Sequence, residues 1–127
     1  MCGIDFVLEN DEEILKINSP RKRLTGPYAV VYKNVPQRWA IVAMDWNDEG
    51  EKKKHHTLGI RWFFGKNGNP NSRRYATWLV IPEPLHHAVL ECLPMDSQIR
   101  DEIYRFLADE IGGNELKESL KSIINQY

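Results

Sequence analysis

The chain has 127 residues, of which 42% are hydrophobic and 28% are charged, and its formal net charge is −1. This length is common for one domain, and the hydrophobic and aromatic content is too high for a disordered chain. No apolar run approaches the roughly 20 residues of a transmembrane helix, and the first residues are acidic where a signal peptide is basic, so we expect a cytoplasmic protein without a membrane partner.

Charge is distributed in three blocks along the chain. Residues 1–13 hold five acids and no Lys or Arg, residues 14–82 hold 13 Lys or Arg against four acids, and residues 83–127 hold nine acids against four Lys or Arg. The three net charges are therefore −5, +9 and −5. Such segregation favours a polyanionic partner or one that is steered electrostatically.

The N-terminal part predicts little regular structure. Residues 3–8 are apolar enough for a short strand, and the acidic stretch over residues 11–17 predicts a turn or a helical turn. The basic triplet Arg21-Lys22-Arg23 lies between the breakers Ser19-Pro20 and Gly26-Pro27, which predicts a loop there.

Two β-hairpins are predicted in the middle of the chain. Residues 28–32 and 39–44 are rich in β-branched and aromatic side chains, and so are residues 57–64 and 75–81, which flank a Gly/Asn-rich tip. A period of two divides the third strand into two faces. We predict that the core face is Leu58, Ile60, Trp62 and Phe64, and that the opposite face is Thr57, Gly59, Arg61 and Phe63.

Helical spacing follows the strands. Leu85, Ala88, Val89 and Cys92 form the predicted buried stripe of a short helix, a longer helix begins at Asp96 or Ser97 and stops at Gly112-Gly113, and Asn114 caps a last helix. We therefore predict an α+β fold in one domain, residues 1–127. Its antiparallel sheet has four to five strands in two hairpins and is covered on one face by two to three C-terminal helices.

The first four residues, Met1-Cys2-Gly3-Ile4, place a cysteine where removal of Met1 would make its own α-amino group available as a base. They resemble the start of class II glutamine amidotransferases, which use an N-terminal cysteine as nucleophile. That resemblance implies catalysis by Cys2, but it covers four of 127 residues and no substrate-clamping segment follows. We therefore predict no catalytic residue, and we expect Cys2 and Cys92 to be free thiols.

The four histidines occur as two adjacent pairs, His55-His56 and His86-His87. Neighbours on a strand point to opposite faces and neighbours on a helix diverge by ~100°, so neither pair can chelate a metal as a unit. We expect these side chains in solvent or at the rim of the core, and we predict no metal and no other cofactor.

The second hairpin combines cations with aromatic side chains. Cations neutralise phosphates and aromatic faces stack on unpaired bases, so this mixture is typical of nucleic-acid binding. Phe63 is the most outward aromatic of the hairpin, because it lies opposite the predicted core face on the side of Arg61. The residues predicted to bind nucleic acid are Lys52, Lys53, Lys54, Arg61, Phe63, Lys66, Arg73 and Arg74.

Three functions stay open at the level of the sequence. The first is a small non-enzymatic binding protein that associates with nucleic acid through residues 52–81. The second is a protein-interaction or inhibitor module, whose opposite charges also permit a homodimer. The third is an enzyme of unrecognised type. A purely structural alternative for the hairpin is that its aromatics fill the core while its cations guard an edge strand.

Overall fold

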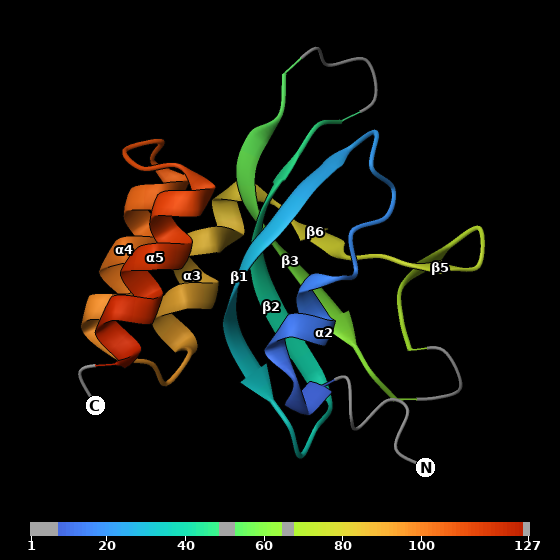
Figure 1. Cartoon of the computed structure of the whole chain (residues 1–127), viewed down its shortest axis with the longest axis horizontal. Helices are drawn as coiled ribbons and strands as arrows, with labels where there is room; N and C mark the ends of the chain where they lie inside the picture. The colour runs from blue at the N-terminus through green and yellow to red at the C-terminus, as the bar shows by residue number, and fades with distance from the viewer. Residues whose placement is uncertain (1–7, 49–52, 65–67, 126–127) are drawn as a thin grey trace.

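The computed structural model describes residues 8–48, 53–64 and 68–125 of the chain. It has the predicted α+β architecture, in which an antiparallel sheet carries the C-terminal helices on one face and a short N-terminal helix on the other (Figure 1). Within the described ranges, no helix combines the length and the apolar character that are needed to cross a membrane.

The strands form one main sheet and one small hairpin. They are β1 (Leu24–Asn34), β2 (Trp39–Trp46), β3 (His55–Trp62), β4 (Asn71–Ser72), β5 (Tyr75–Ala76) and β6 (Leu79–Ile81). The main sheet has the order β1-β2-β3-β6 with antiparallel neighbours, and β4 pairs with β5 separately. The first predicted hairpin is confirmed. The second is confirmed in part, because the strand predicted over residues 75–81 is divided between β5 and β6.

Three helices cover one face of the main sheet, as predicted. They are α3 (His86–Cys92), which follows a single 3-10 turn over Glu83–Leu85, then α4 (Ser97–Leu107) and α5 (Gly113–Ile124). Their apolar side chains pack on those of β1, β2 and β3, and burial of this surface at about 25 cal/mol per Å² is the main favourable term for the layer. The largest fully buried members are Ile41, Leu58, Leu90, Ile103, Phe106 and Leu116.

The predicted caps of the last two helices have different outcomes. Asp96 caps α4, because its side chain accepts a hydrogen bond from the Gln98 N–H at 2.7 Å. Asn114, in contrast, lies inside α5, and Gly112 is the N-cap residue. Its neighbour Gly113 is held against a ring of β1, where an added Cβ would lie 2.3 Å from Tyr28, so glycine is required there for close packing.

The other face of the sheet is also covered, which the period of two does not reveal. Helix α2 (Asp11–Leu15) packs Ile14 into a second core that includes Met44 and Trp78. Phe63 belongs to this core and is 3% exposed, so the expectation that it points outward is wrong. Phe64, which we predicted in the core, is 49% exposed because it follows the end of β3.

The predicted buried stripe of α3 is displaced around the helix. Ala88 and Cys92 are exposed, whereas His86, Leu90 and the following Leu93 are buried. The helix begins only at His86, after the 3-10 turn, and His86 is bonded to the sheet through Ile81 and Thr57 whereas Leu85 is exposed. The expectation of a rim or solvated position is therefore wrong for His86.

Candidate functional site

A loop between α2 and β1 connects two distant parts of the sheet. At its beginning, the Trp78 indole N–H donates to the Ile17 carbonyl at 2.7 Å, and the Thr77 hydroxyl donates to the Ser19 carbonyl at 2.6 Å. Residues 77 and 78 lie between β5 and β6, directly after the small hairpin. The loop is thereby fixed next to the hairpin that carries Arg73 and Arg74.

The other end of the same loop lies against the connection between β2 and β3. The Asn47 N–H donates to the Arg23 carbonyl at 2.9 Å, and the Arg23 guanidinium donates back to the Asn47 carbonyl at 3.4 Å. The Lys54 ammonium donates to the Thr25 hydroxyl. The basic triplet of residues 21–23 is therefore placed between the cations of residues 53–54 and those of residues 73–74.

These contacts join the exposed surfaces of three basic segments: the loop of residues 21–23, the start of β3 with residues 53–54 and, through Thr77 and Trp78, the small β4–β5 hairpin (Figure 1). We call this surface the basic side. Its members are all exposed or half-exposed. They are Arg21, Lys22, Arg23, Lys53, Lys54, Arg73 and Arg74.

Arg73 and Arg74 occupy the two central positions of the tight turn between β4 and β5. Their φ angles are +49° and +74°, and the flanking residues Ser72 and Tyr75 pair directly. Two positive φ angles define the mirror-image turn for which Asn-Gly is the favoured sequence, because a Cβ at either position is strained. Two arginines therefore occupy a turn at a cost in stability, and such outliers occur preferentially at functional sites.

An exposed aromatic side chain accompanies these arginines. Tyr75, which directly follows the turn, is 67% exposed, and Phe64 is 49% exposed. Tyr75 offers the flat ring that base stacking requires next to the turn arginines, whereas Phe64 follows the other end of β3, near the turn between β1 and β2. Tyr75 takes the place that the sequence analysis gave to Phe63.

Arg61 is buried, with only 3% of its surface exposed, and its function in the structure is architectural. Its guanidinium donates to the Pro70 carbonyl and, at 3.2 Å, to the Thr77 carbonyl, and it lies 5.4 Å from the centre of the Phe63 ring. Burial lowers the pKa of this guanidinium. Arg61 thus fixes both ends of the segment that presents Arg73 and Arg74, and it does not reach a ligand itself. Of the other predicted binding residues, Lys52 and Lys66 lie outside the described residues.

A second cluster of polar side chains lies near the beginning of β3, on the face of the sheet that the C-terminal helices cover. Adjacent strands contribute Tyr28, Asp45 and His56, and Asp45 and His56 are direct partners in the β2–β3 register. The Asp45 carboxylate accepts from the Tyr28 hydroxyl at 2.6 Å and from Nδ1 of His56. Burial, followed by the hydrogen bond to Asp45, raises the pKa of Tyr28. The His56 ring is thus held in one orientation.

The free edge of this histidine faces solvent-accessible space. Its ring stacks on Phe106 with centroids 4.0 Å apart, and its Nε2 lies 3.5 Å from Oδ1 of Asp109, just beyond the end of α4. His56 and Asp109 line an open pocket of about 1100 Å³, whose lining also includes Lys53, Lys54 and Glu83. The orientation of a histidine by a carboxylate is common to general bases and to metal ligands.

The second histidine pair is divided between the core and the surface. His86 is buried, and its Nε2 donates to the Ile81 carbonyl at 2.9 Å while lying 3.1 Å from the Thr57 hydroxyl. Burial lowers the pKa of His86, because the imidazolium would lose its hydration there. This histidine closes the main sheet where β6 ends, and its Nε2 is not available to a ligand.

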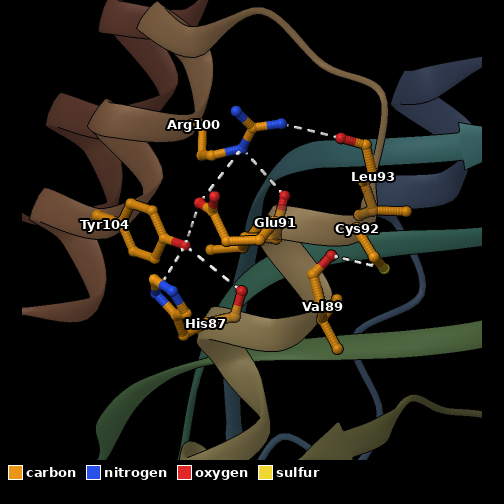
Figure 2. A network of polar contacts seen from close by, with 8 residues as sticks. His87, Val89, Glu91, Cys92, Leu93, Arg100 and Tyr104 are labelled. Atoms are coloured by element: carbon orange, nitrogen blue, oxygen red, sulfur yellow. Dashed lines mark hydrogen bonds and ion pairs between the residues drawn. The ribbon is translucent and has the colours of Figure 1, made fainter.

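His87 belongs to a polar network that joins α3 to α4 (Figure 2). The Tyr104 hydroxyl donates to Glu91 at 2.8 Å and lies 3.1 Å from Nδ1 of His87. Burial, and then the Glu91 carboxylate, raise the pKa of Tyr104 to about 12. Arg100 donates to the carbonyls of Leu90 at 3.0 Å and Leu93 at 2.9 Å, which satisfies groups at the end of α3 that lack helical partners. The network therefore has a structural explanation, the capping and fixing of α3.

The cysteines add no site. Cys2 lies outside the described residues, and Cys92 is an exposed free thiol that donates to the Val89 carbonyl at 3.1 Å. In the ranges that the structure describes, no group of three or more His, Cys, Asp or Glu side chains could hold a metal ion.

Comparisons with protein-family models, curated proteins and solved structures found no match. The function is therefore inferred from the residues of this chain alone. Four residues of the basic side, Lys53, Lys54, Arg73 and Arg74, were predicted from the sequence to bind nucleic acid, whereas the triplet of residues 21–23 was not. Only Ser19-Pro20 breaks regular structure as predicted, because β1 begins at Leu24 and contains Gly26-Pro27, so the predicted loop ends before the second breaker.

Proposed function

We propose that this protein binds polyanions on its basic side and that its ligand class is single-stranded nucleic acid. The observation that carries the proposal is the gathering of three basic segments, far apart in the sequence, by one loop that is bonded at both ends. The C-terminal helices α3 to α5, whose segment carries a net charge of −5, lie on the opposite face of the sheet from the loop of residues 21–23, which favours approach of a polyanion from the loop side, although the short helix α2 beside that loop is also acidic.

Single strands are favoured over duplexes because of an exposed aromatic face. Tyr75 offers a stacking surface directly beside the turn arginines, and stacking needs bases that are not already stacked in a helix. No described helix projects from the basic side in the way that a major-groove recognition helix would. Binding is therefore expected to depend on charge and stacking and to show little base specificity.

The proposal is tested by the fluorescence anisotropy of labelled single-stranded RNA and DNA oligonucleotides and of a duplex. The test variant is Arg73→Ala with Arg74→Ala. The matched control is Lys117→Gln with Lys121→Gln, which removes two exposed cations from α5 on the helical side. We expect the test variant to weaken binding and to reduce the dependence of log K on log salt by about 1.4, since each phosphate contact contributes about 0.7 for single strands. Equal losses in both double variants would show that net charge, and not the basic side, governs binding.

The stacking component is tested separately with Tyr75→Ala and Tyr75→Phe. Loss of the ring is expected to cost about 1–3 kcal/mol of binding free energy without changing the salt dependence. The phenylalanine variant retains a π face and should bind like the parent. If both variants bind single strands as the parent does, the aromatic part of the proposal is wrong and only the electrostatic part stands.

A further inference from the structure

The outer edge of β1 is open to a further strand. β1 lies at one edge of the main sheet with β2 as its inner neighbour, and in the ranges that the structure describes no second strand pairs with it. Every other residue of an edge strand directs its backbone N–H and C=O away from the sheet, where another extended chain can bind them. The edge of β1 therefore offers a backbone template for a partner.

A groove of about 220 Å³ lies along this edge between α2 and α5, which pack on opposite faces of the sheet (Figure 1). Its lining includes Ala29, which belongs to the core under the C-terminal helices, and Val30, which packs on the second core. Because these neighbours point to opposite faces, a groove that contacts both passes around the free edge of β1. Leu15 of α2 and Ile124 of α5 add apolar walls, and Ile124 is 57% exposed. We call this surface the β1 groove.

Both walls of the β1 groove are attached to β1 itself. The Lys33 ammonium donates to the Leu8 carbonyl at 3.3 Å and pairs with the Asp11 carboxylate at 2.7 Å, which holds the beginning of α2. On the other face, Gly113 of α5 packs so closely on the Tyr28 ring that an added Cβ would lie 2.3 Å from it. The groove is therefore formed before a ligand arrives, which lowers the cost of binding.

The two rims of the β1 groove carry opposite charges. Asp11 and Glu12 line it from α2, and Lys117 and Lys121 line it from α5. Asp11 is already paired with Lys33, so Glu12 is the carboxylate that an incoming cation meets. Alternate side chains of an added strand point to the two walls in turn.

We propose that the β1 groove binds an extended segment of another protein, which adds to the sheet as a strand beside β1. The apolar walls select a segment with apolar side chains at alternate positions. The rims select a cation on the side chains that face α2 and a carboxylate on those that face α5. The residues of this groove are separate from those of the basic side.

A second copy of this chain fits the same edge less well. Two antiparallel β1 strands pair about a two-fold axis that is perpendicular to the sheet, so α2 meets α2 and α5 meets α5. Acidic rims then lie against acidic rims and lysines against lysines, which disfavours the pair. A separate protein can place the opposite charge at each rim.

The inference is tested with a displayed library of random 12-residue peptides that is selected on the unmodified full chain. The enriched peptides are synthesised, and their affinities are measured by isothermal titration. The test variant is Ile124→Gln, and the matched control is Leu85→Gln, which removes a side chain of similar exposure, 51%, outside the groove. We expect enriched sequences with alternating apolar residues, a weakening of about tenfold or more in Ile124→Gln, and affinities within about twofold of the parent in the control.

Two further measurements report the mode of binding. Amide hydrogen exchange in residues 28–33 should slow in the complex, because the outward N–H groups of the edge gain partners. The double variant Glu12→Lys with Lys121→Glu exchanges the charges of the rims without changing the net charge, and it should weaken the charged peptides by about tenfold. All of these changes are at exposed positions, and folding is checked by circular dichroism.

The proposal is overturned if no peptide is enriched, or if the enriched peptides bind Ile124→Gln as tightly as the parent. Unchanged affinity after the exchange of rim charges, or unchanged exchange in residues 28–33, overturns it as well. Sedimentation of the pure chain tests the competing occupant. A dimer that Ile124→Gln dissociates would show that a second copy, and not another protein, occupies the groove.

Discussion

Replacement of the turn arginines by Asn-Gly should stabilise the protein while it weakens ligand binding. In the variant Arg73→Asn with Arg74→Gly, both residues prefer the positive φ angles that the turn requires. An ordinary L-residue in that region costs about 1–2 kcal/mol, so the pair costs about 2 kcal/mol or more. Glycine also increases the conformational entropy of the unfolded chain, which lowers the free energy of unfolding by about 0.4–1 kcal/mol. The expected net gain in the free energy of unfolding is therefore about 1 kcal/mol.

The gain is measurable in two ways. For a chain of this size, 1 kcal/mol raises Tm by about 3–5 °C in differential scanning calorimetry. Hydrogen exchange of the amides of Ser72 and Tyr75, which pair directly across the turn, reports the same gain if the hairpin opens locally before the rest of the protein. The binding loss is measured with single-stranded oligonucleotides at fixed salt.

The control that separates charge from backbone strain is Arg73→Ala with Arg74→Ala. It removes the same two charges but keeps a Cβ at both positive φ angles, so it should lose binding without gaining stability. The reasoning is refuted if the Asn-Gly variant is no more stable than the alanine variant. It is also refuted if the Asn-Gly variant binds as tightly as the parent.

Three further predictions concern the scaffold. Gly59→Ala should destabilise the fold by about 1–3 kcal/mol in denaturant titration, because the new Cβ would lie 2.7 Å from Met44 and 2.9 Å from Trp78 in the second core. Arg61→Met should cost about 2–3 kcal/mol and speed hydrogen exchange in residues 68–77, since it leaves buried carbonyl acceptors without their donor. His86 has a lowered folded pKa, so the unfolded chain binds the proton more readily and stability should fall as the pH drops below 6.5; His86→Gln should remove that slope between pH 7 and 5, measured by thermal denaturation.

The sequence was sufficient for the first hairpin, for the three C-terminal helices and for the side-chain parity of β3, whereas the strand predicted over residues 3–8 lies outside the described residues but for Leu8. Leu58 and Arg61 do face opposite sides of the sheet, as a period of two requires. Which segments cover each face of the sheet depends on tertiary packing, here that of α2 and of the loop that follows it. An arginine among apolar neighbours therefore looked like a surface residue, although the carbonyls that receive its hydrogen bonds come from residues 70 and 77.

The His56 cluster was invisible for a related reason. Adjacent histidines cannot chelate as a unit, and that argument is unaffected by the structure. The partners of His56 come instead from other elements, Asp45 across the β2–β3 register and Asp109 after α4. Knowledge of the β2–β3 register would have identified Asp45 as the partner of His56. The sequence did not define that register, because the length of the connection between the two strands was uncertain.

The central claim is that the basic side binds single strands through phosphate contacts, and the most direct test is the salt dependence of that binding in the unmodified protein. The affinity for a single-stranded oligonucleotide is measured by anisotropy from about 50 to 200 mM salt, where the basic side should give a linear plot of log K against log salt with a slope of about −3 to −5 for four to seven phosphate contacts. The absence of binding at the lowest salt, or binding with a slope near zero, would contradict the account.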